Sequence, residues 1–308
     1  MWRYVATRLL HGTAVVFLVA TVTFLILHLA PGNPIDVLVG EASVSREQVE
    51  AIKHLWGLDR PLYEQYLTWL GNMARGDFGV SVIRTGVPVG QMLLQAAPVT
   101  VTLNLLAFVV SAAIAIPVGI LAGVRRYSAF DYIGTVGATL GVALPSFWVS
   151  LMVIILFAVK LGWLPPFGLL SWKGYVLPVA VLATEQTAVI ARLMRGSIAA
   201  VLSQDYVRTG WAKGLGETTV VLRHAVRNAL LPVITVLGYR MAFLLSGTII
   251  VETVFALPGV GRLLTDSVYH LDYQVVQVIA LVLAAIVVTA NIATDLVYAL
   301  VDPRIRIR

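Results

Sequence analysis

The side chains best placed to act on something outside the chain lie in one run, DYVRTGWAKGLGETTVVLRHAVRNALLP, from Asp205 to Pro232. Their types suit charge pairing and hydrogen bonding rather than covalent chemistry. The run lies between long apolar segments and is far longer than a turn needs. Gly214 and Gly216 divide it into two halves with helical patterns. These features favour a docking element.

The second half of this run has two unlike faces at helical spacing. The apolar face consists of Val221, Leu222, Ala225, Val226, Ala229 and Leu230. The opposite face carries Arg223, His224, Arg227 and Asn228. We expect the apolar face to pack on the chain's own membrane spans and the basic face to meet a partner. A helix resting on anionic lipid fits the same pattern equally well.

The sequence does not predict a catalytic centre. The absence of cysteine excludes disulfides, thiolate metal sites and a cysteine nucleophile. The five histidines are scattered without metal-ligand spacing, and no serine stands in a nucleophile elbow. No GxxxxGK[ST] loop is present to bind nucleotide phosphates. We expect a non-enzymatic chain with no cofactor or metal of its own, so any energy must come from another subunit or an ion gradient.

Composition places these elements in a membrane. The chain is 59% hydrophobic and 12% charged over 308 residues, which is far too apolar for a soluble domain. Its apolar runs reach the length of about 20 residues that crosses a bilayer. We predict an all-α membrane protein with six transmembrane helices. Their approximate ranges are 9–30, 98–122, 132–158, 176–194, 232–254 and 275–300. Pro117, Pro145 and Pro178 are expected to kink spans rather than break them.

The arrangement of the basic residues explains the net charge of +6 without nucleic acid. Lysine and arginine flank the spans in the positive-inside pattern, which puts both termini in the cytoplasm. We expect an N-terminal span at 1–30 and an extracytoplasmic loop domain at 31–97. A core of five spans follows at 98–308, and it includes the cytoplasmic loop at about 203–231.

The loop domain at 31–97 has two helical patterns and a turn. One predicted helix begins near Ser45 and places Val49, Ile52, Leu55 and Trp56 on one face. A second amphipathic pattern contains Tyr63, Tyr66, Leu67 and Leu70, and Gly76–Gly79 reads as a turn. A compact cap and helices lying on the membrane surface fit these patterns equally well.

Several motifs in order resemble the permease subunits of ABC importers, in the peptide/nickel branch. The run DYVRTGWAKGL, followed by LRHAVRNALLP, is similar to the cytoplasmic EAA loop of that family, on the side of the first permease of dipeptide and oligopeptide systems. The resemblance continues over nearly the whole chain. It includes APGNP at 30–34, GLDRPLYEQY at 57–66, RGDFGVS at 75–81, PSFW at 145–148, LPP at 164–166, ARLMR at 191–195, VETVFALPGVG at 251–261 and DPRIR at 302–306.

Within the loop, the sequence departs from the family pattern in two respects. Arg208, Thr209 and Gly210 stand where Glu-Ala-Ala is expected, and the stretch after Gly214 is longer than the general motif. Gly210 is expected to weaken its helix by roughly 0.5–1 kcal/mol relative to alanine. The residues that the resemblance assigns to coupling with an ATPase are Arg208, Lys213, Gly214, Leu215, Glu217, Arg223 and His224.

The resemblance also implies partners, location and mechanism. It implies a type I ABC importer fold in the bacterial cytoplasmic (inner) membrane, in contact with lipid. The expected partners are a second homologous permease, two ATPase subunits that hold ATP and Mg, and an extracytoplasmic substrate-binding protein. The implied mechanism is alternating access, and the cargo is a dipeptide, an oligopeptide or peptide-like cargo such as haem. Two other classes fit the bare pattern of spans: a secondary transporter driven by an ion gradient, and a membrane scaffold or receptor.

Polar residues inside the spans are candidates for the translocation pathway, because polar groups at membrane depth usually face a cavity or a partner. The candidates are Asn104, Ser111, Ser146, Glu185, Gln186, Arg240 and Ser246. Helix packing is the alternative role for most of them. Glu185 either lines the pathway or pairs with Arg240. Asp295 is expected to be solvated or paired, and Glu252 to have a structural role near the gate.

Overall fold

The computed structural model describes residues 2–29, 54, 59–81, 83–84, 86–242 and 248–301. Within these ranges, the side chains of 2–6, 238–242 and 293–301 are not described. Contacts divide the chain into two compact units, one formed by 1–98 with 258–308 and the other by 99–257. Apart from an isolated bridge between Val80 and Pro88, the regular structure of the described residues is helical.

The first unit is built around two long apolar helices, α1 (Trp2–Leu29) and α14 (Tyr273–Val301). They pack directly against each other. Gly12 permits a close approach, because a Cβ built there would lie 2.6 Å from Val288 Cγ1. A shared core joins them to α4 (Leu62–Ala74), α13 (Val260–Tyr269) and the first turns of α5 (Val89–Val124).

The helix predicted around Tyr63–Leu70 is confirmed as α4. Trp69 and Met73 are its buried residues, whereas Tyr63 and Leu67 remain exposed. The turn at Gly76–Gly79 is also present, and Gly79 donates its N–H to Asp77 Oδ1 at 3.0 Å. The helix expected to begin near Ser45 lies outside the described residues.

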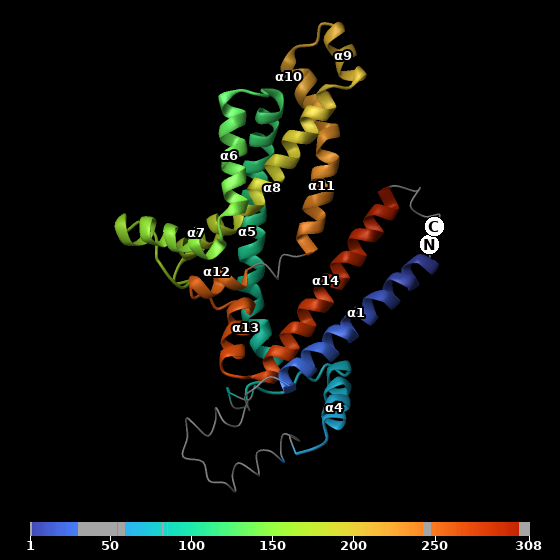
Figure 1. The fold of residues 1–308 in the computed structure, drawn as a ribbon, viewed down its shortest axis with the longest axis vertical. Coiled ribbons are helices and arrows are strands. Elements are labelled where there is room, and N and C mark those ends of the chain that lie inside the picture. The colour runs from blue at the N-terminus through green and yellow to red at the C-terminus, as the bar shows by residue number, and fades with distance from the viewer. Residues whose placement is uncertain are drawn as a thin grey trace. The chain divides into compact units, whose positions relative to one another are not determined.

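The second unit contains the rest of α5 and the helices α6 (Ala129–Ala143), α8 (Val176–Leu202) and α11 (Val226–Ala242), which run alongside one another (Figure 1). Two apolar cores hold it together. One joins α5 and α8 to the short helix α12 (Ile249–Val254), and the other joins α5 and α8 to α11. Both α5 and α8 contribute residues to each core.

Pro145 breaks the third predicted span instead of kinking it. α6 ends at Ala143, and α7 (Ser146–Val153) continues into the π-helix η1 (Ile154–Lys160). The two parts meet at an angle of 107°, and α7 runs across the end of α6 in Figure 1. Leu144 is extended with ψ 127°, the conformation that proline imposes on the residue before it. Pro117 lies inside the continuous helix α5, as expected.

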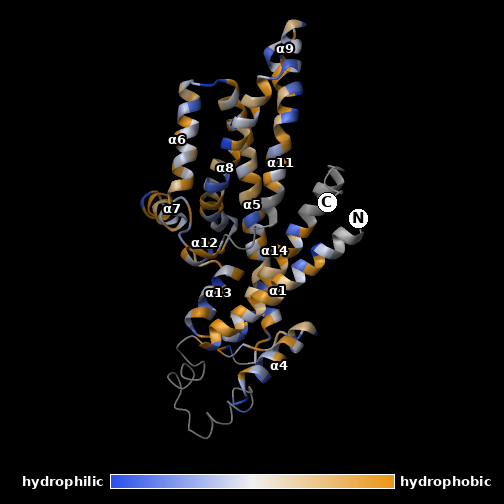
Figure 2. Cartoon of the chain, turned by 45° about the vertical axis from the view of Figure 1, so that its right-hand side comes forward, coloured by the Kyte–Doolittle hydropathy of each residue, from blue (hydrophilic) through white to orange (hydrophobic). Residues whose placement is uncertain are grey.

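The apolar helices confirm the predicted all-α membrane architecture. Within the described ranges, five helices are long and apolar enough to cross a membrane, or six if the bent pair counts as one span. Figure 2 shows hydrophobic residues along α5, α6 and α14, with hydrophilic residues gathered at the α5–α6 turn and around α9 (Asp205–Ala212). The sequence also predicts that residues 31–97 form a domain outside the cytoplasm, between an N-terminal span and the core. This division stays a prediction.

Candidate functional site

The candidate coupling segment, at about 203–231, begins directly after α8 ends at Leu202. Its first helix, α9, ends in a complete glycine cap. Gly214 has φ +77°, its N–H donates to the Trp211 carbonyl at 2.9 Å, and the Leu215 N–H donates to the Gly210 carbonyl at 3.3 Å. This pair of hydrogen bonds is the Schellman motif, which needs a left-handed residue and so favours glycine. The predicted division of the run at Gly214 is therefore confirmed, and its cause is a helix cap.

The inner side of α9 packs against the helix that follows it. Val207 and Gly210 are buried, and so is Val220 at the start of the π-helix η3 (Val220–Ala225). A Cβ built on Gly210 would lie 3.7 Å from Val220 Cγ2 and 3.8 Å from Leu215 Cδ1, which are ordinary contacts. Gly210 therefore has room for the alanine that the family motif carries.

The π-helix changes the register of the predicted apolar face. Val221, Ala225 and Ala229 are buried as expected, but Leu222 is 59% exposed. A π-turn carries an extra residue, so a periodicity of 3.6 misplaces side chains within it. The prediction that Leu222 packs inward is wrong for this reason.

The outer side of the segment exposes a mixed aromatic, aliphatic and basic surface. Tyr206, Trp211, Leu215 and Leu222 are exposed, although all four are large apolar side chains. Arg208, Lys213, Glu217 and Arg223 are exposed beside them, and His224 is half-buried. Arg208 lies 3.7 Å from Asp205 in an exposed pair, which contributes little stability. Interfaces are enriched in aromatic residues and arginine, so this surface can bind a protein partner.

Two pathway candidates on α5 lie inside the second unit. Asn104 is buried and donates to the Thr100 carbonyl of its own helix at 2.8 Å. Ser111 is fully buried, donates to the Phe108 carbonyl at 2.8 Å and lies 3.2 Å from Gln186 Oε1. These contacts correspond to the helix-packing alternative, and a lining role for the two residues stays a prediction.

The other pathway candidates are spread over several elements. Glu185 is exposed and Gln186 half-buried on α8, and Ser146 is half-buried at the start of α7. The Arg240 side chain, Ser246 and the Asp295 side chain lie outside what the structure describes. The possible pairing of Glu185 with Arg240 therefore stays a prediction.

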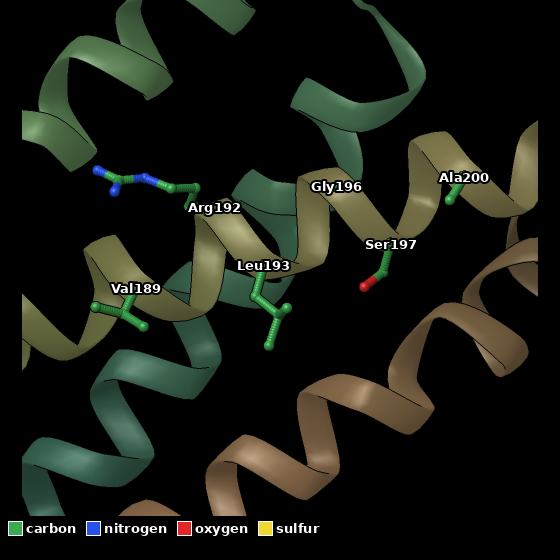
Figure 3. A pocket seen from close by; sticks show the side chains of 6 residues that line it. All are labelled: Val189, Arg192, Leu193, Gly196, Ser197 and Ala200. Atoms are coloured by element: carbon green, nitrogen blue, oxygen red, sulfur yellow. The ribbon is translucent and has the colours of Figure 1, made fainter.

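An open groove of about 570 Å³ follows one face of α8 (Figure 3). Its lining residues are Val189, Arg192, Leu193, Gly196, Ser197 and Ala200. The Arg192 side chain extends away from Leu193 and Ser197. Among the described residues, no group of three His, Asp or Glu side chains could hold a metal ion.

Two polar pairs were not predicted from the sequence. Thr100 donates to Glu252 Oε1 at 2.8 Å, and both residues are fully buried between α5 and α12. Arg195 donates two N–H groups to the Asp131 carboxylate, from Nε to Oδ1 and, at 2.8 Å, from Nη2 to Oδ2. Asp131 itself has a local sequence signal, because it lies three residues after Ser128, the N-cap residue of α6. No local pattern pointed to its partner on α8.

Comparisons with known proteins agree along the whole chain. The family model described as "Binding-protein-dependent transport system inner membrane component" matches residues 115–307, and the model described as "Binding-prot-dependent transport system membrane comp, N-term" matches residues 1–105. The chain is 38% identical to the oligopeptide transport system permease protein AppB of Bacillus subtilis (strain 168) over 315 residues, which cover 99% of each chain. It is 39% identical to the glutathione transport system permease protein GsiC of Escherichia coli (strain K12) over 306 residues, again covering 99% of each.

A solved structure, titled "Crystal structure of an amino acid ABC transporter with histidines", has a similar fold. It aligns with a TM-score of 0.52 at 16% identity, over 67% of this chain and 92% of that chain. At this level of identity the likeness concerns the fold alone.

Proposed function

The chain belongs to the family of binding-protein-dependent transport system inner membrane components, and from this premise we propose that it is the permease subunit of an ATP-driven importer of peptides or peptide-like molecules. Relatives at 38% and 39% identity over full length are permeases of oligopeptide and glutathione transport systems. They favour this function over a transporter driven by an ion gradient. A peptide bond with a free amine and carboxylate is the chemistry that these two cargoes share.

The observation that best supports the proposal is the exposed surface of the coupling segment. Trp211 and Leu215 stay exposed on a segment whose inner side is firmly packed. A rigid, capped helix that exposes aromatic and basic side chains is suited to bind a protein, since little conformational entropy is lost on binding. We assign this surface to a cytoplasmic ATPase subunit.

The remaining partners follow from the same proposal. A second, homologous permease completes the translocation pathway, two ATPase subunits supply ATP and Mg chemistry, and an extracytoplasmic protein delivers the substrate. The chain then lies in the bacterial inner membrane with both termini in the cytoplasm. Nucleotide state biases a two-state membrane domain through the coupling segment, which gives alternating access. Glu185 and Gln186 on α8 are our candidates to face the pathway.

Charge reversal at the segment tests the proposal. We expect Lys213→Glu and Arg223→Glu to reduce co-purification of the ATPase subunits and substrate-stimulated ATP hydrolysis, while membrane insertion is unchanged. Lys173→Glu, in the stretch between η1 and α8, is the matched control and should leave both readouts as in the wild type. Unchanged stimulation in both coupling variants would falsify the docking assignment. If the intact wild-type complex contains no ATPase, the importer proposal itself fails.

A further inference from the structure

The helix α6 packs against α8 along a seam of small residues. Asp131, Gly134, Ala138 and Gly141 are the residues of α6 that are buried or half-buried at helical spacing, while Phe130, Tyr132, Ile133 and Val136 on its other faces are exposed. At Gly141 a Cβ would lie 3.2 Å from Ala188 Cβ and 3.3 Å from the Thr184 carbonyl. Small residues allow this close approach. Asp131 is the one charged side chain among these four residues.

A cavity lies among α5, α6 and α8 next to Arg195. It has a volume of about 150 Å³ and is walled mainly by small residues of α5, α6 and α8, with Arg192 and Arg195 at its edge. The side chains of α6 and α8 make fewer direct contacts around this cavity. A directional interaction next to it can therefore help to set the register of the two helices.

The Asp131 carboxylate supplies that interaction. Its side chain is 4% exposed, and it accepts from Arg195 Nε and, at 2.8 Å, from Arg195 Nη2. The Tyr127 backbone N–H donates to the same carboxylate at 3.0 Å, and Tyr127 itself is left-handed with φ 60°. One carboxylate thus fastens both α6 and the α5–α6 turn to α8. A planar, two-point pair fixes distance and orientation together.

On its other sides α8 is packed tightly. Gly119 and Gly123 of α5 lie so close to it that a Cβ would fall 2.7 Å from the Ala191 carbonyl and 2.9 Å from the Arg195 carbonyl. Met194 and Ile198 of α8 share a core with Ala225, Ala229 and Val233 of η3 and α11. The coupling segment, α8 and this part of α5 therefore form one continuous packed body, and the Asp131–Arg195 pair adds a directional link from α6 to this body.

We propose that Asp131 and Arg195 are positioning residues for energy coupling, because their ion pair makes α6 and the α5–α6 turn move with α8 when the coupling segment is displaced. The inference rests on the proposed function. Without the pair, the α5–α6 turn and the adjoining end of α6 lose their directional link to α8, and part of the displacement is lost. ATP is then hydrolysed without a matching movement of substrate.

The test uses the full complex in lipid vesicles and measures the amount of substrate imported per ATP hydrolysed. We expect Asp131→Asn and Arg195→Gln to keep co-purification with the ATPase and its basal activity. The import per ATP should fall by about five-fold or more, the lower end of typical coupling free energies between sites. The reciprocal exchange, Asp131→Arg with Arg195→Asp, should recover part of the loss.

Arg195→Lys is a milder change, for the case in which the other variants fail to assemble. It keeps the charge but removes the two-point geometry, so it should lower import per ATP while the complex stays intact. Thr100→Val is the matched control, because it breaks another polar pair of the same unit away from the coupling segment. It should lower thermal stability without changing the import per ATP.

The possible results distinguish a failure of the Asp131–Arg195 proposal from a failure of the proposed importer function. If Arg195→Lys and any other assembled variant of the pair import as much substrate per ATP as the wild type, the pair does not position α6 for coupling. The same conclusion follows if Thr100→Val lowers the ratio equally, since the effect is then one of stability. If wild-type complex shows no ATP-dependent import, the proposed function fails instead.

Discussion

The Asn228 side-chain amide donates a hydrogen bond of 2.8 Å to the Tyr206 hydroxyl, and this bond fastens the first helix of the coupling segment to α11. The same amide lies 3.2 Å from the carbonyl of His224, in the π-helix η3 that leads into α11. Tyr206 and Asn228 lie near opposite ends of the segment, 22 residues apart in the chain, and their side chains link these ends. We expect this link to help hold α9 against α11.

Tyr206→Phe removes that link while keeping the ring. We expect the backbone amides of α9 to exchange hydrogen for deuterium roughly two- to ten-fold faster, which corresponds to a net loss of about 0.5–1.5 kcal/mol. Mass spectrometry of the intact complex measures this exchange. Tyr132→Phe is the control, since no hydrogen bond of its hydroxyl is found within the described part of the chain. Equal protection of α9 in both variants would show that the link is inert.

Two glycines four residues apart should respond in opposite directions to alanine. Gly210 is helical with room for a methyl group, so Gly210→Ala should stabilise α9 by roughly 0.5–1 kcal/mol. Gly214 is left-handed at φ +77°, so Gly214→Ala should destabilise its cap by about 1 kcal/mol. Exchange protection of the α9 amides reports both changes. A shift of the same sign in both variants contradicts the assigned helix cap.

Gly119 sets the contact between α5 and α8. A Cβ there would fall 2.6 Å from Met194 Cβ, so Gly119→Val should overpack the contact and cost about 1–3 kcal/mol. Thermal unfolding of the purified complex measures the loss. Gly137→Val on α6 is the control, because a Cβ built at Gly137 would have nothing within 4 Å. A similar melting temperature for both variants would show that the close approach does not matter.

In the first unit, the Ser81 hydroxyl donates to the Asp272 carboxylate, and both residues are buried. Ser81→Ala removes a donor to a buried charge, so it should lower stability by roughly 1–3 kcal/mol. Limited proteolysis of the loop between α4 and α5 should become faster. Ser203→Ala, at an exposed serine that donates only to the Ala200 carbonyl of its own helix, serves as the comparison. Equal cleavage rates in the two variants would show that the Ser81–Asp272 hydrogen bond does not hold this loop in place.

How much of the candidate site could be predicted depends on how local its causes are. The break at Gly214 was predictable, because a glycine after a helical pattern is itself a signal for a cap. The exposure of Leu222 was not, since a π-turn leaves the spacing of apolar residues looking like that of an ordinary helix. Pro145 lies between these cases: proline marks the place of a break, but the angle of 107° depends on the core against which α7 packs.

The sequence by itself determined that this chain is a helical membrane protein, where its apolar segments lie and to which family it belongs, because hydrophobicity, helical periodicity and ordered motifs are properties of contiguous residues. Only the tertiary structure decided that Asp131 pairs with Arg195, 64 residues further along, and that Thr100 pairs with Glu252. A polar residue in an apolar helix has the same local pattern whether it faces a pathway, a lipid or a buried partner. Its role is settled by the residue that packing places opposite it, and that residue lies on another helix.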